Sequence, residues 1–173
     1  MTIGAMDFQS LYERYGPAVR RFALFLCGDP TIADDITSET FVRVWPARGR
    51  IRELTVKSYL FAIARNVYRD VQRRTWRQTV LDAEGPDERV SVHTHVEQKE
   101  EVIAVLKALQ GLPEVDRAIL LMRALDDMTY EEIAGALDIT ASTAKVKAHR
   151  ARAKLMQARN PAREKSSVSG GKP

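Results

Sequence analysis

Two stretches of the sequence combine side chains that could bind a polyanion. Ten basic and two acidic residues lie between positions 43 and 77, and eight basic residues and one acidic residue lie between positions 140 and 165. From residue 56 onward the first stretch also carries four aromatic residues, Tyr59, Phe61, Tyr68 and Trp76. Basic side chains pair with phosphates and aromatic rings stack on unpaired bases, so these residue types are typical of nucleic-acid binding. For either stretch alone, a solvated basic surface is the alternative.

Length and composition restrict the class of protein. The chain has 173 residues, of which 45% are hydrophobic and 29% are charged, and its net charge is +4. These values are typical of a globular protein with one or two domains. The apolar runs are far shorter than the roughly 20 residues that span a bilayer, and the N-terminus lacks the pattern of a secretory signal. We therefore expect a cytoplasmic protein with no membrane insertion.

Helical periodicity recurs along the chain, and no run shows the sustained alternation of a strand. We therefore expect an all-α fold with two small helical domains joined by a flexible linker. The expected boundaries are residues 1–77 for the first domain, 78–98 for an exposed linker, 99–159 for the second domain and 160–173 for a disordered tail.

Prolines and capping residues should set the helix ends in the first domain. Pro17 should kink or split a helix whose apolar stripe covers residues 8–26. Asp29 should cap a second helix that Pro46 ends. A third helix should run from about residue 56 to 77, with an apolar stripe inward and its arginines outward.

The second domain has the pattern of a helix-turn-helix. Thr129 and Glu132 form a capping box before a short helix, and Thr140 should cap a basic helix with alanines on its inner face. Small inner residues let the two helices cross closely, which favours a helix-turn-helix over a surface helix of an ordinary bundle. The residues of the basic helix that could reach a duplex are Ser142, Thr143, Lys145, Val146, Lys147, His149, Arg150 and Arg152.

The other two segments are open to more than one interpretation. The aromatic residues of the third helix could stack on single-stranded bases or could seal a small core, and spacing does not decide between these possibilities. The acidic segment 29–39 precedes Phe41 and Trp45, which look exposed. It could be a protein-docking face or an ordinary helix N-terminus rich in acids.

These residues together resemble a sigma factor of the extracytoplasmic-function (ECF) group of the bacterial sigma-70 family. Residues 7–77 are similar to its region 2 through Gly28-Asp29, Ala33-Asp34-Asp35, Glu39-Thr40-Phe41, Trp45, Tyr59 to Asn66, Asp70 and Arg73-Arg74. Residues 109–155 are similar to its region 4 through Leu112-Pro113, Arg117, Tyr130 to Ala134, Leu137, Ile139, Thr143, Lys145 and His149 to Arg152.

The resemblance implies a promoter-specificity subunit of RNA polymerase. Docking on the β′ clamp helices would use Asp34, Asp35, Glu39 and Phe41. Capture of the −10 element as a single strand would use Lys57, Tyr59, Arg65, Asn66, Arg69 and Arg73. The basic helix would read the −35 element as a duplex, and the apolar face of region 4 would meet the β flap. The resemblance also implies an anti-sigma partner, and it implies no cofactor.

Two other classes of protein are weaker interpretations. An enzyme is disfavoured because the sequence has no glycine-rich phosphate loop and no paired-histidine zinc motif, and because Cys27 lies on an apolar helix end where a packed thiol is expected. His93 and His95 could bind a metal only with further ligands, and we expect no metal site. A stand-alone repressor or activator would share the helix-turn-helix but would have no use for the first domain.

Overall fold

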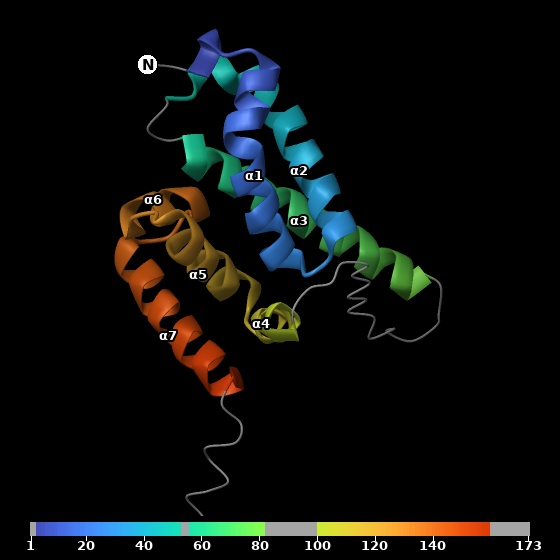
Figure 1. The fold of residues 1–173 in the computed structure, drawn as a ribbon, viewed down its shortest axis with the longest axis vertical. Coiled ribbons are helices and arrows are strands. Elements are labelled where there is room, and N and C mark those ends of the chain that lie inside the picture. The colour runs from blue at the N-terminus through green and yellow to red at the C-terminus, as the bar shows by residue number, and fades with distance from the viewer. Residues whose placement is uncertain (1–2, 53–55, 82–99, 160–173) are drawn as a thin grey trace, which may run out of the picture.

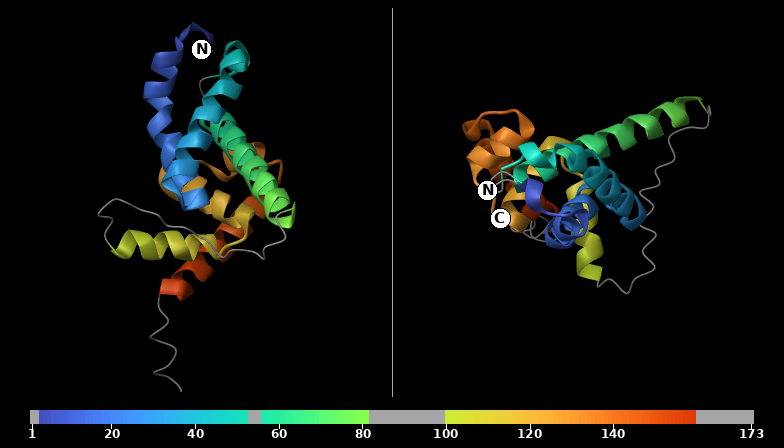
Figure 2. Two further views of the ribbon diagram at one scale, coloured as in Figure 1. Left: turned by 90° about the vertical axis from the view of Figure 1, so that its right-hand side faces the viewer. Right: turned by 90° about the horizontal axis from the view of Figure 1, so that it is seen from above.

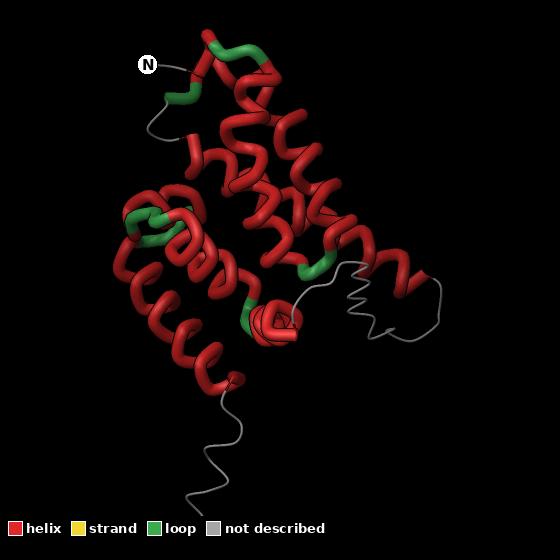
Figure 3. Tube along the Cα trace, in the orientation of Figure 1, coloured by secondary structure: helices red, strands yellow, loops and turns green. Residues whose placement is uncertain are grey.

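The computed structural model describes residues 3–52, 56–81 and 100–159, and over these ranges it consists of helices without strands, which confirms the all-α fold (Figures 1 and 3). The first half comprises α1–α3 and the second half comprises α4–α7. The α-helices are α1 (Phe8–Cys27), α2 (Pro30–Val44), α3 (Val56–Leu81), α4 (Glu100–Gln110), α5 (Glu114–Asp126), α6 (Tyr130–Leu137) and α7 (Ala141–Arg159), with 3₁₀ turns at Ile3–Ala5 and Trp45–Arg50.

The first helix is continuous, so Pro17, which was expected to kink or split it, does not split it. Proline removes one backbone donor from the helix interior. The apolar face nevertheless continues across this position, with Tyr15, Val19 and Phe22 buried. Burial of an amphipathic face stabilises a helix more than local propensity does, so packing retains one helix here.

The end of α2 and the end of α3 differ in how well the sequence predicted them. Asp29 caps α2 by accepting a hydrogen bond from the Ile32 amide, and α2 ends just before the turn that contains Pro46, as expected. Helix α3 continues to Leu81, so residues 78–81 are helical and the linker does not begin at residue 78. The remainder of the expected linker, with His93 and His95, and the expected tail 160–173 lie outside the described residues.

The second half confirms the predicted helix-turn-helix. The Thr129 hydroxyl accepts from the Glu132 amide at 3.2 Å, while the Glu132 carboxylate accepts from the Thr129 amide at 2.7 Å, so both halves of the capping box form. Three residues separate α6 from α7. The Thr140 hydroxyl then accepts from the Thr143 amide at 3.1 Å and caps α7.

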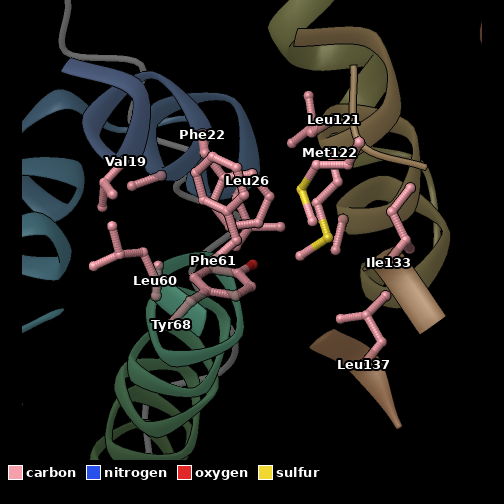
Figure 4. Packing of buried hydrophobic residues seen from close by; sticks show 14 of the residues in the cluster. Val19, Phe22, Leu26, Leu60, Phe61, Tyr68, Leu121, Met122, Ile133 and Leu137 are labelled. Carbon is pink, nitrogen blue, oxygen red and sulfur yellow. The ribbon is translucent and has the colours of Figure 1, made fainter. Parts of the chain in front are cut away.

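The two halves of the chain share one hydrophobic core rather than two separate ones. Helix α1 packs against α5 and α4, and α3 packs against α6 (Figures 1 and 2). Figure 4 shows Phe22 and Phe61 of the first half on one side of this apolar layer and Met122 and Ile133 of the second half on the other. The two halves are therefore packed directly against each other, and we call the contact between them the seam.

Candidate nucleic-acid interfaces

Helix α7 has small residues on its inner face and basic residues on its outer face. Ala144, Ala148 and Ala151 are buried, where α7 packs against α5 and α6. Alanine lets helix axes approach closely. The side chains on the opposite side are exposed, and they include Lys145, Val146, His149, Arg150 and Arg152 together with Ser142.

A shallow groove of about 330 Å³ lies along this outer face. It is lined by Tyr130 of α6 and by Lys145, Val146, His149 and Arg152 of α7. The Val146 side chain is 57% exposed although it is apolar. Cationic groups beside an exposed apolar side chain suit a duplex groove, where lysine and arginine contact phosphate or guanine and an aliphatic group contacts the thymine methyl.

Three of the expected duplex-binding residues, Ser142, Thr143 and Lys147, have side-chain partners inside the second half. The Lys147 ammonium donates to the buried carboxylate of Asp116 at 3.3 Å, so Lys147 points toward α5 rather than outward. The Thr143 hydroxyl accepts from the Thr140 hydroxyl at 2.8 Å. The structure brings the remaining members of the set together on the outer face of α7.

The expected single-strand residues lie on two different faces of α3. One set recurs at helical spacing and is exposed; we call Tyr59, Asn66, Arg69 and Arg73 the open stripe. A second set, Lys57, Phe61, Arg65 and Tyr68, also recurs at helical spacing, and we call it the seam stripe. At 100° per residue, Lys57 and Asn66 point about 180° apart.

The seam stripe faces the second half of the chain. The Arg65 guanidinium donates twice to the Glu114 carboxylate, at 2.6 and 2.9 Å, and its side chain is only 11% exposed. The Lys57 ammonium lies 3.7 Å from the Asp126 carboxylate. The structure therefore does not place all six expected single-strand residues on one surface.

The aromatic residues of α3 divide between the two functions that the sequence left open. Phe61 and Tyr68 are buried in the shared core, whereas Tyr59 is 37% and Trp76 69% exposed. The first pair therefore seals the core, and the second pair is accessible to a partner. Tyr59 begins the open stripe, where three polar or cationic side chains follow it along the helix.

An acidic face lies on α2, on the side away from the second half. Asp34 accepts from Arg20 at 2.6 Å, and Arg43 joins Glu39 at 2.8 Å to Asp70 at 3.1 Å. These carboxylates raise the pKa of the Arg43 guanidinium through their hydrogen bonds. Asp34, Asp35 and Glu39 are all exposed, as a docking face requires.

Phe41 does not belong to this acidic face. Its side chain is completely buried, and its ring lies 4.9 Å from the ring of Tyr12, centroid to centroid. The expectation that Phe41 is exposed is therefore wrong, because the position falls on the inner side of α2. The exposed apolar residue is its neighbour Val42, 61% exposed, which lines a hollow of about 400 Å³ with Asp35 and Glu39.

Sequence reasoning missed a polar network at the seam. Arg117 is buried, and its guanidinium donates to the Gln110 side chain at 2.6 Å and to the Tyr68 hydroxyl at 3.2 Å. Gln110 in turn donates to the backbone oxygen of Phe25 at 3.2 Å. Burial raises the pKa of the Tyr68 hydroxyl, which stays a neutral partner for Arg117. The partners of Arg117 are an amide and a hydroxyl group rather than a carboxylate, and its burial depends on the packing of the two halves. The sequence therefore offers no pattern from which this network could have been predicted.

Cys27 has the environment of a packed thiol. Burial raises the pKa of its thiol to about 11, and its sulfur lies 3.2 Å from the backbone oxygen of Asp29. At neutral pH the group is protonated and therefore a poor nucleophile. This agrees with the expectation from the sequence.

The helix-turn-helix, joined to a second helical unit with a cationic face of its own, defines a two-part DNA-binding protein. The family described as Sigma-70 region 2 matches residues 11–78, and the family described as Sigma-70, region 4 matches residues 103–155. The chain belongs to the sigma-70 family, in its ECF group, and is an RNA polymerase sigma factor. The first half corresponds to region 2 and the second half to region 4.

Relatives and solved structures agree with this assignment. The chain is 30% identical to the ECF RNA polymerase sigma factor EcfG of Rhodopseudomonas palustris, over 80% of this chain and 77% of that protein. It is 28% identical to the ECF RNA polymerase sigma factor SigE of Mycolicibacterium smegmatis over 86% of this chain, and it spans 60% of that protein's length.

The similarity to solved structures extends over both halves. Sigma factor RpoE of Bartonella quintana, solved in complex with the anti-sigma factor NepR, superposes with a TM-score of 0.75 at 26% identity, over 88% of this chain and 96% of that one. CnrH, solved in complex with the cytosolic domain of CnrY, gives a TM-score of 0.65 at 26% identity, over 90% and 88% of the two chains.

None of the helices in ranges 3–52, 56–81 and 100–159 combines the length and the apolar content needed to cross a membrane.

Proposed function

We propose that this sigma factor divides promoter recognition between its two halves. The outer face of α7 reads the −35 element as a duplex, and α3 with the loop before it holds the −10 element as a single strand. The observation that carries this proposal is the presence of two separate cationic faces with different chemistry. The face on α7 combines basic residues with the exposed Val146, whereas the open stripe on α3 combines them with the exposed Tyr59.

The energetics of strand separation require a partner for this activity. Opening about ten base-pair steps costs roughly 14 kcal/mol at a mean of about 1.4 kcal/mol per step. Stacking of two bases on aromatic side chains returns only about 2–6 kcal/mol. The chain therefore supplies specificity, while the polymerase core supplies the remaining strand contacts and the catalytic site. This division makes the chain a non-catalytic subunit that acts in the cytoplasm with the polymerase.

The acidic face of α2 is the proposed docking site for the β′ clamp helices. Asp34, Asp35 and Glu39 supply exposed carboxylates, and Val42 supplies an apolar contact beside them. We assign Val42 the apolar role that the resemblance implied for Phe41. The apolar surface of region 4 would meet the β flap when the chain opens on the polymerase.

Control by an anti-sigma factor is the remaining part of the proposal. It is supported by the similarity to RpoE, which was solved in complex with the anti-sigma factor NepR. The partner would keep this chain away from the polymerase core until a signal releases it.

Run-off transcription with purified polymerase core tests the proposed function. We expect specific transcripts only when the chain and the core are both present. Asp35→Asn should lower core affinity without changing promoter preference, and Thr31→Ala, at an exposed position of the same helix, is the matched control. Transcripts that are equally abundant without the chain, or unchanged core affinity for Asp35→Asn, would contradict the corresponding part of the proposal.

A further inference from the structure

Asp116 of α5 carries a carboxylate that is buried inside region 4, with only 2% of the residue exposed. Its Oδ1 accepts a hydrogen bond of 3.3 Å from the Lys147 ammonium of α7. We propose that this ion pair positions the recognition helix: Asp116, through Lys147, fixes the rotation of α7 at which the helix reads the −35 duplex. The inference rests on the proposed function, since it concerns the same outer face of α7.

The apolar contacts of α7 leave its rotation weakly defined. Its buried residues are Ala144, Ala148 and Ala151, and Leu155 is half-buried. Packed helices are held at a fixed angle by side-chain ridges that enter grooves on the neighbouring helix. Methyl groups form low ridges, so α7 lies close to α5 and α6 but can turn or slide against them with little loss of contact (Figure 1). A further interaction is needed to select one rotation.

The ion pair supplies this selection because a buried carboxylate is costly without a partner. Turning α7 by one residue, about 100°, would carry the Lys147 ammonium away from Asp116 and leave the buried charge unpaired. Asp116 also lies in the first turn of α5, where the positive end of the helix dipole favours an acid. Buried polar groups can fix the register of packed helices in this way even where they add little stability.

The same pair determines which residues of α7 face outward. At about 100° per residue, Lys145 and His149 lie about 160° and 200° around the helix from Lys147. Both are exposed, and both point away from α5 when Lys147 points toward it. A rotation of about 20° would move a group that lies about 5–6 Å from the helix axis by about 2 Å. Hydrogen-bond lengths vary by only about 0.5 Å, so this rotation would break base contacts, whereas the attraction to phosphates does not depend on sequence.

The alternative is that Lys147 contacts a phosphate and that Asp116 only competes for it. The Lys147 side chain is 32% exposed and is directed to a carboxylate, which favours the positioning role. The two roles predict opposite effects for Asp116→Asn. Loss of a positioning residue lowers affinity for the recognised duplex, whereas loss of a competitor releases Lys147 and raises affinity for every duplex.

Titrations of the full chain with two duplexes test the inference. One duplex is selected from a random pool by the wild-type chain, and the other is a scrambled duplex of the same composition. Asp116→Asn and Lys147→Met should each lower the ratio of the two affinities about tenfold, the value of one base contact, and leave the salt slope unchanged, while Lys147→Arg should keep the ratio. Glu131→Gln, which removes an exposed acid from the first turn of α6, is the matched control. Higher affinity of Asp116→Asn for both duplexes, or a salt slope reduced by about one in Lys147→Met, would overturn the inference.

A double variant separates positioning from stability. Asp116→Leu combined with Lys147→Met replaces the pair by apolar side chains of similar size, a change that commonly keeps or raises stability. The double variant should therefore melt no lower than the wild-type chain but should still discriminate poorly between the two duplexes. Recovery of discrimination together with stability would show that the pair has only a structural role, and the inference would then be wrong.

Spin labels measure the rotation of α7 without DNA. Ala124→Cys in α5 and Ala153→Cys in α7, both at exposed positions, would carry the labels in a Cys27→Ala background. The distribution of distances between the labels should be narrow with Asp116 in place and should broaden or shift with Asp116→Asn. An unchanged distribution would contradict the positioning role.

The two proposals fail in different ways. If the wild-type chain selects no duplex from the pool, the proposed −35 reading fails, and the label distances still decide whether Asp116 fixes the rotation of α7. If the wild-type chain and Asp116→Asn discriminate equally between the two duplexes, only the positioning role fails.

Discussion

The buried carboxyl of Asp126 shows that ion pairs with neighbouring cations need not stabilise the fold. Burial raises the pKa of its carboxyl above the usual value of 3.8, and the nearby cations Arg21 and Lys57 oppose this shift only in part. Folding therefore disfavours the charged form of this carboxyl relative to the unfolded chain. The associated stability is fully present below the unfolded-state pKa and is lost as the pH rises through the raised pKa.

Asp126→Asn should consequently stabilise the protein at neutral pH. The amide oxygen can still accept from Arg21 and Lys57, while the cost of burying a charge disappears. We expect the free energy of unfolding to rise by about 1 kcal/mol at neutral pH. The gain should shrink as the wild-type carboxyl becomes protonated in acid. Urea titrations across this pH range measure it, and a loss of stability at neutral pH would contradict the argument.

Lys145 and Val146 are neighbours on α7 that should affect duplex binding in different ways. Lys145→Ala removes one phosphate contact, so it should weaken binding to all sequences and reduce the salt slope by about one. Val146→Ala removes only an apolar contact, so it should leave the salt slope unchanged and reduce discrimination at one base pair by about 1 kcal/mol. Titrations at several salt concentrations separate the two, and equal slopes for both variants would exclude the phosphate contact.

At the scale of the helix, the close approach of α7 to its neighbours depends on its alanines. Ala148→Leu should destabilise the protein by about 1–3 kcal/mol, because a larger side chain must displace packed neighbours. It should also tilt the recognition helix and weaken −35 binding. Ala153→Leu places the same side chain on the exposed side of α7 and is the control. Thermal melts compare them, and equal melting temperatures would show that α7 does not pack closely.

The helix ends were largely predictable because short-range chemistry sets them. The Asp29 cap with Pro30, the Thr129 box and the Thr140 cap each depend on residues within one turn. The end of α3 was misjudged, because the helix continues to Leu81 rather than ending at residue 77. The misjudged positions within helices depend on longer-range packing. Pro17 stays inside a helix that the shared core holds together, and Phe41 lies on the inner side of α2, where its ring meets Tyr12 of α1.

At the scale of the whole molecule, the pairing of the two halves could not be read from the sequence. Glu114 looks like an ordinary acid in the first turn of a helix, and its partner Arg65 is 49 residues away. The same limit applies to the single-strand residues. Their spacing showed that all lie on one helix, but only the packed structure shows that Arg65 faces region 4 while Arg69 faces solvent.

A core substitution in the first half should therefore weaken the second half too, but by a smaller amount. Phe22 is fully buried, its ring centroid lies 4.8 Å from that of Phe61, and it faces Met122 across the seam (Figure 4). Phe22→Ala should destabilise the first half by about 3–5 kcal/mol. The destabilisation of region 4 should not exceed the free energy with which the two halves pair. Beyond that amount, the halves separate and region 4 no longer depends on the stability of the first half.

Amide hydrogen exchange resolves these two losses in one experiment. Protection should fall strongly in α1 and moderately in α5, while Gln78→Ala, at an exposed site, should leave both unchanged. In a variant with Ser58→Cys of α3 and Gly135→Cys of α6, which line one cavity, a bismaleimide can join the two halves. This link should bring the loss in α5 closer to the loss in α1, because the linked halves can no longer separate. If exchange in α5 is unaffected by Phe22→Ala in the linked chain, the halves do not share a cooperative core.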